Sequence, residues 1–574
     1  MRVIICLSFF IFCTGTSRAQ LTPYEKGNKN VSATYDEIIS WYKALEKKSN
    51  QLSFIENGMT DAEKPLHLVL ISADQNFNPK QWHQQNKIII LINNGIHAGE
   101  PDGIDASMML TRDIVNNNIK LPVNVCLAII PIYNIGGCLN RNSTTRVNQN
   151  GPKEYGFRGN SQNLDLNRDF TKCDSKEAKS FSKIFQWLQP DIFIDNHVSD
   201  GADYQHTMTL LTTQYDKLGG SLGHYLKETF EPSIYKNMSE KGWDLVPYVD
   251  FESTNFDEGM DAFYDPPRYS SGYAALFNTM SFVPETHMLK PYNQRVKSTY
   301  DLMVSSIEEG HLHAKEILSE RKKASEELLS KQEFALKWKL QKDSFSTITF
   351  HGYERDSALS EATGLQKYFY NHQKPFTKKI KYYNHYEPVG IVKKPKAYII
   401  PQGWHDVIER MKSSGVIMKK LNKDSSFLVT TYKILSYESY PKPYEKHHKN
   451  FNVKTESVVS TIKFSKGDYY IDVNQFAERY IIEMLEPTGD DSFFAWNFFD
   501  GILQQKEGYS DYRWEDLAAE YLKKDTSLQA ALAEKKKESP EFAKDAHQIL
   551  DFIYKHSPYY EKVNMRYPVY RVEF

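Results

Sequence analysis

Three histidine–glutamate pairs in this sequence have the spacing His-x-x-Glu, and both side-chain types can hold a metal ion. The pairs are His97/Glu100, His313/Glu316 and His351/Glu354. The spacing alone is weak evidence, because a chain with 17 histidines is expected to contain such a pair by chance. His313 lies in a charged helical stretch, where residues three apart simply share one face of a helix. His351 has no neighbouring candidate ligand, so we interpret both of these pairs as ordinary surface.

The context of His97 and Glu100 is different. An apolar run, KIIILI, precedes them, and the glycines Gly95 and Gly99 permit a tight backbone that aims both side chains at one point. A catalytic zinc takes about three protein ligands, from histidine or carboxylate, and keeps one position open for water. The third ligand should follow another strand, and the best candidate is His197 in the segment IDNHVSD. Two interpretations are open at this point: a metal site, or a loop histidine satisfied by local hydrogen bonds.

Other polar residues in the same region have complementary chemistry. Asn167 and Arg168 are adjacent in NLDLNRDF, where the planar guanidinium suits a carboxylate and the amide adds a neutral donor. Arg158 lies in a glycine-rich loop, YGFRGN, and Glu285 ends the apolar run MSFVPE. A carboxylate in such an apolar, poorly hydrated environment can have a raised pKa and act as a general base. Each residue also has an ordinary structural interpretation: a surface ion pair for Arg168 and a strand-end charge for Glu285.

The elements that must position these residues follow from the hydrophobic pattern. Short apolar runs with strand character alternate with helical stretches from about residue 30 to 300, which predicts an α/β domain whose mixed sheet is flanked by helices. The predicted strands are LHLVLISAD, KIIILINNG, NVCLAIIPIYN and PDIFIDNH, and the predicted helices between them include GIDASMMLTRDIVNN and EAKSFSKIFQWLQ. In such sheets ligands bind where strand ends open into loops, which is where both histidine segments fall.

Four motifs in this order and spacing resemble the M14 metallocarboxypeptidases, the carboxypeptidase A-like zinc exopeptidases. They are GxHxxE at 95–100, RxNxxxxDLNR at 158–168, DxH at 195–197 and the apolar strand that ends in Glu285. The resemblance covers about residues 30 to 310, roughly half of the chain, and no part of the C-terminal half. The combination is far more specific than His-x-x-Glu alone. It implies a zinc peptidase that acts on peptides with a free C-terminal carboxylate.

The resemblance also implies a role for each matching residue. His97, Glu100 and His197 match the ligands of one zinc ion per chain. Glu285 matches the glutamate that activates the zinc-bound water and then protonates the leaving amine. Arg158 matches the arginine that polarises the scissile carbonyl.

Three more positions follow from the same resemblance. Asn167 and Arg168 match the pair that holds the substrate's C-terminal carboxylate, and Asp165 matches the carboxylate that orients the first zinc-binding histidine. The family usually places a mobile tyrosine about 20 residues before the catalytic glutamate. Here the candidates are Tyr264, Tyr269 and Tyr273, and the residue that lines the specificity pocket falls near Arg268 and Ser270. The sequence therefore leaves the preferred terminal residue open.

The rest of the chain predicts further parts. Residues 1–19 have the layout of a secretory signal peptide, with Arg2, a short apolar run and a small-residue end, which predicts a periplasmic or extracellular protein. Residues 20–310 are predicted as the catalytic domain, 311–345 as a helical linker, and 346–574 as a second, α+β domain of unknown role.

Composition excludes some classes of partner. The formal net charge of −2, from 71 basic and 73 acidic residues, gives no support to a nucleic-acid partner. No stretch beyond the predicted signal reaches the roughly 18 apolar residues that a membrane helix needs, so we expect no integral membrane segment.

Other functions fit the same residues. Zinc hydrolases with this ligand set also cleave cell-wall peptides or deacylate N-acyl amino acids, so an amidohydrolase is the alternative. A catalytically inactive binding protein on the same scaffold is a third hypothesis. Because such proteins typically lose a ligand or the base, the presence of His97, Glu100, His197 and Glu285 argues against it.

Overall fold

The computed structural model describes residues 20–249 and 256–573, and they divide into two compact units. The N-terminal unit contains the residues up to 324 together with 340–385, and the C-terminal unit contains 325–339 together with the residues from 386 onward. The predicted signal peptide, residues 1–19, lies outside the described residues.

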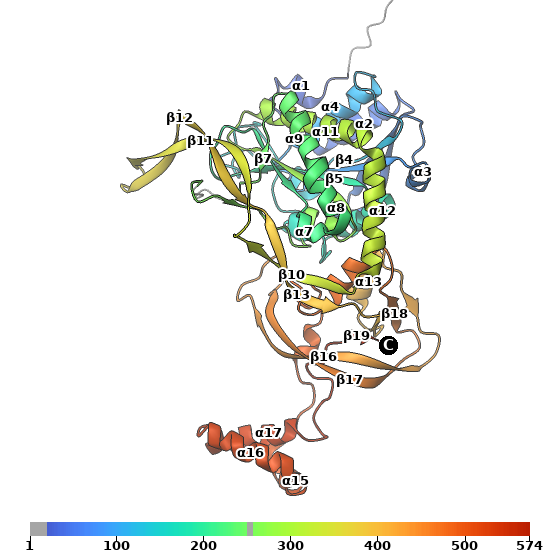
Figure 1. The fold of residues 1–574 in the computed structure, drawn as a ribbon, viewed down its shortest axis with the longest axis vertical. Helices are drawn as coiled ribbons and strands as arrows, with labels where there is room; N and C mark the ends of the chain where they lie inside the picture. Colours follow the sequence, from blue (N-terminus) through green and yellow to red (C-terminus); the bar gives the residue numbers. More distant parts are fainter. Residues whose placement is uncertain (1–19, 250–255, 574) are drawn as a thin grey trace, which may run out of the picture. The chain divides into compact units, whose positions relative to one another are not determined.

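A mixed eight-stranded sheet forms the centre of the N-terminal unit, in the order β1-β2-β4-β3-β5-β9-β6-β7 (Figure 1). β3 is parallel to both β4 and β5, and β5 is parallel to β9, whereas β1/β2, β2/β4 and β6/β9 are antiparallel. The mixed α/β fold predicted from the alternating pattern is confirmed. The strands are β1 (Leu52–Met59), β2 (Pro65–Ser72), β3 (Ile88–Asn94), β4 (Val125–Ile130), β5 (Ile192–Ser199), β6 (Met208–Thr212), β7 (Val246–Pro247) and β9 (Met280–His287).

Helices cover both faces of this sheet, which explains why every residue of β3, β4 and β5 is buried. On one face, α4 and α11 pack together and share a core with Ile90 and Ile192. On the other, Phe181 of α6 contacts Phe193 of β5, and Phe185 contacts Phe277 just after α10. The helices are α1 (Pro23–Lys26), α2 (Tyr35–Glu46), α3 (Pro79–Gln84), α4 (Asp102–Val115), α5 (Ile135–Leu139), the 3-10 turn η1 (Leu166–Arg168), α6 (Lys176–Leu188), α7 (Tyr215–Leu218), α8 (Gly220–Tyr225), the π-helical turn η2 (Leu226–Phe230), α9 (Glu231–Glu240), α10 (Ser270–Ala275), α11 (Tyr292–Leu312) and α12 (Ala314–Ser330).

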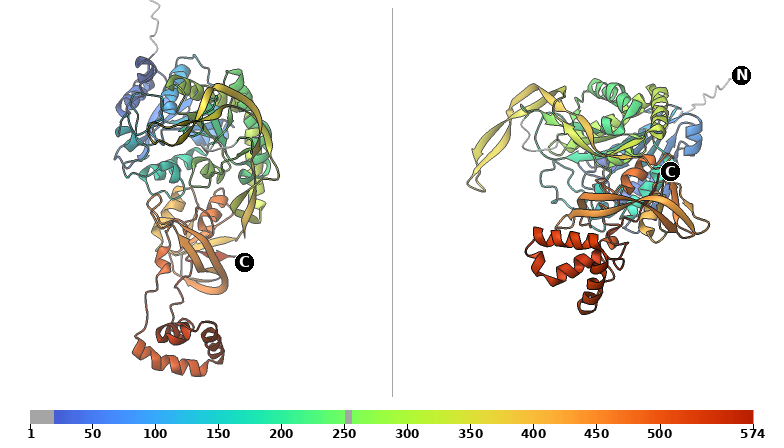
Figure 2. Two further views of the ribbon diagram at one scale, coloured as in Figure 1. Left: turned by 90° about the vertical axis from the view of Figure 1, so that its left-hand side faces the viewer. Right: turned by 60° about the horizontal axis from the view of Figure 1, so that its bottom comes forward.

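A long hairpin of β11 (Ser346–Leu359) and β12 (Gln366–Tyr383) extends from the same unit (Figures 1 and 2). Its base is held by a small apolar cluster that includes Tyr204 and Phe350, and by the short strand β8 (Met260–Asp261), which pairs with β12. The predicted boundary at residue 346 therefore differs from the observed division, because residues 340–385 pack on the N-terminal unit. The apolar side chains at the hairpin base give the physical reason.

The C-terminal unit is a second α+β body, as predicted. Its six-stranded sheet has the order β15-β18-β14-β19-β16-β17, and β10 pairs with β13. The predicted helical linker is only partly helical, because α12 ends at Ser330 and a strand follows. The helices α15, α16 and α17 form a group with its own core around Trp514 (Figure 2). The elements are β10 (Glu333–Gln341), β13 (His385–Lys393), β14 (Ala397–Ile400), α13 (His405–Ser413), β15 (Lys419–Lys420), β16 (Ser425–Ser439), β17 (Asn450–Phe464), β18 (Tyr469–Asp472), α14 (Glu478–Leu485), η3 (Asp500–Leu503), α15 (Asp511–Lys524), α16 (Thr526–Glu538), η4 (Phe542–Lys544), α17 (Ala546–Lys555) and β19 (Tyr570–Val572).

Within residues 20–249 and 256–573, no helix is both long enough and apolar enough to cross a membrane.

Candidate active site

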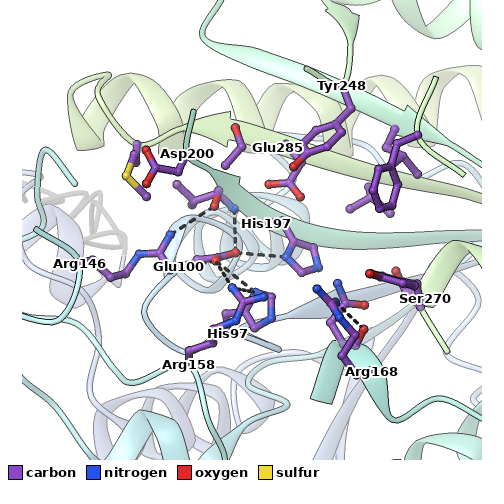
Figure 3. Close-up of a pocket in the computed structure, with 18 of the residues that line it drawn as sticks. His97, Glu100, Arg146, Arg158, Arg168, His197, Asp200, Tyr248, Ser270 and Glu285 are labelled. Atoms are coloured by element: carbon purple, nitrogen blue, oxygen red, sulfur yellow. Dashed lines mark hydrogen bonds and ion pairs between the residues drawn. The ribbon is translucent and has the colours of Figure 1, made fainter. Parts of the chain in front are cut away.

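The ends of neighbouring strands bring His97, Glu100 and His197 into one group (Figure 3). β3 and β5 are adjacent and parallel, so the turn after β3 and the end of β5 meet at the same edge of the sheet. One ligand atom from each of the three side chains lies within 4.8 Å of the other two. Nδ1 of His97 is 3.1 Å from Oε1 of Glu100, and Nδ1 of His197 is 3.1 Å from Oε2 of the same carboxylate. All three side chains are buried.

Two glycines make this turn possible. Gly95 has φ +63°, a left-handed conformation that disfavours other residues, and a side chain there would collide with Ile132. At Gly99, a Cβ atom would lie 2.8 Å from the side chain of Arg146 and 2.9 Å from the main-chain oxygen of Gly156. At both glycine positions the surroundings are too close for a larger residue, and the tight turn between them fixes the direction of His97.

Carboxylates hold the outer nitrogen of each histidine ring. Nε2 of His97 is 3.0 Å from Asp165, and Nε2 of His197 is 3.1 Å from Asp195, which also accepts a hydrogen bond from Asn93. Metal-binding histidines typically have such an outer carboxylate partner, which fixes the ring orientation. Two imidazole nitrogens and a carboxylate that converge in this way fit a zinc ion.

The role of Asp195 was not predicted from the sequence. A signal was present, because Asp195 and His197 are two residues apart on a strand and their side chains leave the same face.

Two arginines flank Glu100. Nη1 of Arg146 is 3.0 Å from Oε1 of Glu100, and the same guanidinium donates to the main-chain oxygen of Val198. Nη1 of Arg158 is 3.7 Å from Oε1 of Glu100, and Nη2 of Arg158 is 2.9 Å from Oδ2 of Asp165. Burial opposes ionisation of Glu100, yet His97 and Arg146 hold its pKa well below the usual range. Sequence reasoning missed Arg146, because the surrounding segment TTRVNQN has no spacing that identifies it.

Glu285 stands beside His197 because the two residues are opposite one another in the pairing of β5 with β9. Its side chain lines the pocket and is partly exposed to it. The surrounding protein screens the carboxylate from bulk water, and this desolvation, with a smaller effect of Glu100, raises its pKa to about 8. A carboxyl group with this pKa can both accept and return a proton near neutral pH.

Asn167 and Arg168 lie in η1, which is capped by Asp165. The carboxylate of Asp165 accepts a hydrogen bond from the main-chain nitrogen of Asn167 at 2.9 Å. Arg168 donates to the main-chain oxygen of Asn167 at 2.9 Å, and its guanidinium lies over the ring of Tyr269 at 4.2 Å from the centroid. Both residues line the pocket that contains the possible metal ligands.

The pocket has a volume of about 610 Å³. Of the candidate tyrosines, Tyr269 lines it, whereas Tyr273 lies in the aromatic core with Phe181 and Phe185, and Tyr264 is not among the lining residues. Tyr248 also lines the pocket and was missed, because it precedes the segment in which the family's spacing placed the tyrosine. The lining residues are His97, Glu100, Thr145, Arg146, Val147, Asn148, Arg158, Asn167, Arg168, His197, Val198, Ser199, Asp200, Leu211, Tyr248, Phe263, Asp265, Tyr269, Ser270, Val283, Glu285 and Met288.

Comparisons with known proteins agree with this geometry. Residues 38–198 match the family model described as zinc carboxypeptidase, Peptidase_M14. This part of the chain is similar to the zinc carboxypeptidase family. The predicted resemblance is thereby confirmed, as is the prediction of a metallopeptidase. No family model matches the C-terminal half.

The curated relatives that match most of this chain are distant in sequence. Carboxypeptidase 2 of Trichophyton rubrum is 21% identical over 499 residues, which cover 83% of this chain and 85% of the relative. Carboxypeptidase 2 of Trichophyton tonsurans is 21% identical over 71% of this chain and 73% of its own length.

Two solved structures match about half of this chain at low identity. Carboxypeptidase A from Helicoverpa armigera is 14% identical with a TM-score of 0.39, over 50% of this chain and 75% of that one. A metallo-carboxypeptidase from Pseudomonas aeruginosa is 11% identical with a TM-score of 0.36, over 50% and 70%.

Proposed function

We propose that this protein is a zinc-dependent metallocarboxypeptidase that hydrolyses the C-terminal amino acid from peptides. One observation carries the proposal: the three possible metal ligands, a carboxylate with a raised pKa and an arginine–asparagine pair all line a single pocket. Removal of a terminal residue requires all three kinds of group.

The metal would be held by His97, Glu100 and His197. Bound zinc supplies a Lewis acid that polarises a carbonyl group and lowers the pKa of a bound water to about 7. Asp165 and Asp195 keep the two imidazole rings turned toward the ion, so the ligands need little rearrangement when it binds.

Glu285 is the proposed general base. Its carboxylate takes a proton from the attacking water and then delivers that proton to the nitrogen of the leaving amino acid. The raised pKa suits this double role, because a group is most effective in both directions when its pKa lies near the working pH. The register opposite His197 holds it at the end of the sheet where the peptide bond must lie.

Arg158 is proposed to stabilise the negative charge that develops on the carbonyl oxygen. Its hydrogen bond to Asp165 holds the guanidinium in place before substrate arrives. Loss of one such donor typically lowers the rate by a factor of about 10² to 10³.

Asn167 and Arg168 are proposed to bind the free carboxylate of the substrate's last residue. The planar guanidinium can donate two parallel hydrogen bonds to a carboxylate, and stacking on Tyr269 limits its rotation. This pair explains why the enzyme would remove a terminal residue and not cut within a chain.

The test compares one peptide with a free C-terminus and the same peptide with an amidated C-terminus, each incubated with zinc-loaded protein. Mass spectrometry should show stepwise loss of terminal residues from the first and no change in the second. Equal rates on both would contradict the proposal and favour an endopeptidase or a deacylase.

We also propose that the protein is exported to the periplasm or the extracellular space. The support is the layout of residues 1–19, which ends in Ser17-Arg18-Ala19. Sequencing the N-terminus of the protein recovered outside the cytoplasm should give Gln20 as the first residue, and an intact Met1 would contradict this.

A further inference from the structure

Arg146 lines the active-site pocket, yet the proposed mechanism gives it no role. Each of the three nitrogens of its guanidinium donates a hydrogen bond to an oxygen of the protein. Nη1 donates to Oε1 of Glu100 at 3.0 Å, Nη2 to the main-chain oxygen of Val198 at 3.3 Å, and Nε to Oε1 of Gln149 at 2.7 Å. Arg146 and Glu100 lie side by side in Figure 3, and the side chain of Arg146 is only 13% exposed. The protein itself therefore fixes the position of this guanidinium.

The other arginine beside Glu100 is held differently. The side chain of Arg158 is 45% exposed, and its Nη1 is 3.7 Å from Oε1 of Glu100, so this arm can turn toward a substrate carbonyl. A substrate could recruit the guanidinium of Arg146 only by breaking contacts that hold Glu100. We therefore expect Arg146 to act through Glu100 and not on the substrate.

A closed ring of hydrogen bonds connects Arg146 to two of the possible metal ligands. The main-chain nitrogen of Val198 donates to Oε2 of Glu100 at 2.8 Å, and the main-chain oxygen of Val198 accepts from Arg146. Since Arg146 also donates to Oε1, both carboxylate oxygens of Glu100 have an outer partner. The ring joins the turn after β3 to the end of β5, where His197 precedes Val198, so it fixes the carboxylate relative to that histidine.

The rest of the Arg146 side chain is also supported. Its stem passes over Gly99, where a Cβ atom would lie 2.8 Å from Cδ of Arg146. Nε2 of Gln149 donates to the main-chain oxygen of Gly99 at 3.0 Å, which links the support of Nε to the same turn. The main-chain nitrogen of Arg146 donates to the hydroxyl of Tyr155 at 3.1 Å. The backbone, the stem and the guanidinium are thus each held, unlike those of a typical surface arginine.

We propose that Arg146 is a positioning residue for the metal site, which holds Glu100 in the orientation that zinc requires. This inference rests on the proposed zinc-dependent function and adds a residue that acts on a metal ligand alone. A carboxylate that is already oriented loses less conformational freedom when the ion binds. The positive charge of Arg146 would by itself repel a metal cation, so the benefit comes from geometry. The guanidinium reaches the carboxylate with one arm and the main chain with the other, which an ammonium group cannot reproduce.

The test is Arg146→Lys in the full-length protein, because lysine keeps the charge and loses the two-armed contact. Competition with a zinc chelator gives the dissociation constant for zinc, which should rise by a factor of about 10 to 100. Gln149→Met removes one support of the guanidinium and no charge, and it should cause a smaller rise in the same dissociation constant. Thermal unfolding of the metal-free proteins establishes that each variant is folded.

A matched control is Arg141→Lys, in the same loop. The guanidinium of Arg141 also donates to main-chain oxygens, those of Ser32, Ala33 and Glu154, but Arg141 is absent from the lining of the active-site pocket. Its replacement should leave the dissociation constant for zinc unchanged.

Steady-state kinetics at saturating zinc provides a second measurement. In Arg146→Lys, kcat for a free-ended peptide should fall while KM stays near the wild-type value, because Arg146 does not contact the substrate. A KM that rises several-fold with kcat unchanged would overturn the proposal, since that pattern belongs to a substrate-binding residue.

The zinc measurements distinguish the remaining outcomes. An unchanged dissociation constant in Arg146→Lys overturns the proposal, and so does an equal rise in Arg141→Lys, which would indicate a general effect of the loop. A wild-type protein that binds zinc but releases no residue from any peptide contradicts the proposed function. The role of Arg146 in metal binding would still stand in that case, because the chelator competition does not depend on activity.

Discussion

Two pockets of the N-terminal unit contain histidines, and they differ in what the ring nitrogens do. In the active-site pocket, carboxylates hold the outer nitrogens of His97 and His197, and the inner nitrogens converge on Glu100. The second pocket, of about 360 Å³, is lined by His206 and His351 among others. There Nδ1 of His206 is 2.8 Å from the main-chain oxygen of Asp244, and Nε2 accepts a hydrogen bond from the main-chain nitrogen of His351 at 3.1 Å.

Both nitrogens of His206 are therefore committed to the backbone, and none is left to bind a metal. His351 itself belongs to a His-x-x-Glu pair, yet its ring pairs with the hydroxyl of Thr377. The difference shows that a histidine in a pocket is not by itself a metal ligand. One ring nitrogen must be held by a partner so that the other nitrogen points at a centre shared with further ligands.

The largest expected difference concerns metal content. His197→Ala should lose nearly all bound zinc, because one of three ligands is removed from a site that zinc binds with about three protein ligands. His351→Ala should keep the wild-type content. Elemental analysis of the dialysed proteins measures both. Zinc retained in the first variant, or lost in the second, would reverse the roles of the two pockets.

Replacing the base should separate catalysis from metal binding. Glu285→Gln should reduce kcat by a factor of about 10² to 10⁴ with the zinc content unchanged, because it removes the proton acceptor and no metal ligand. Steady-state kinetics on a free-ended peptide measures this. Glu354→Gln, in the third His-x-x-Glu pair, is the control and should have full activity. Substantial turnover by Glu285→Gln would mean that the base lies elsewhere.

The same residue should govern the acid side of the pH profile. Glu285 must be ionised to accept a proton, and its pKa is raised from 4.5 to about 8 by desolvation. Activity should therefore fall about tenfold per pH unit below an apparent pKa that lies between these values, since a bound cation shifts it downward. The measurement is kcat/KM from pH 4 to 9 at saturating zinc. A profile that is flat down to pH 4.5 would contradict this assignment.

A smaller effect is expected from the carboxylate behind His197. Asp195→Asn should weaken zinc binding about 10- to 100-fold, because the ring loses an ionised partner and its orientation. Competition with a zinc chelator gives the affinity. Asp244→Asn is the matched control: its partner in the second pocket uses a main-chain oxygen, which the substitution leaves in place.

The smallest effect concerns stability. Burial lowers the pKa of His206 to about 4, so the unfolded chain binds a proton below pH 6.5 that the folded protein does not. The free energy of unfolding should fall between pH 6.5 and pH 4, by about 1–3 kcal/mol for this residue. In His206→Gln the decrease in the free energy of unfolding between pH 7 and pH 5 should be smaller than in the wild type. Urea unfolding at the two pH values measures this decrease. An unchanged difference between the two pH values would exclude His206 as a contributor.

Much of the candidate site could be predicted because its residues follow strands with strong apolar patterns. The run before His97 and the run before His197 identify both strand ends, and the mixed fold follows from the alternation of elements. Arg146 and Tyr248 were missed because their approach to the pocket depends on how loops fold back, which no periodicity encodes. The predicted domain boundary at residue 346 differs from the observed division of the chain, because Phe350 packs against Tyr204 of the N-terminal unit. This contact joins segments that are far apart in the sequence.

The pairing of β3, β5 and β9 has a consequence for how such a chain can vary over evolutionary time. Adjacent residues of a strand face opposite sides, so inserting one residue before His197 in β5 would turn its imidazole away from Glu100 and Glu285. Insertions and deletions are therefore excluded from the central strands and can accumulate in loops, in the β11/β12 hairpin and in the C-terminal unit. The register of the sheet fixes the relative positions of the site residues, whereas the loops, the hairpin and the C-terminal unit can change in length without moving them.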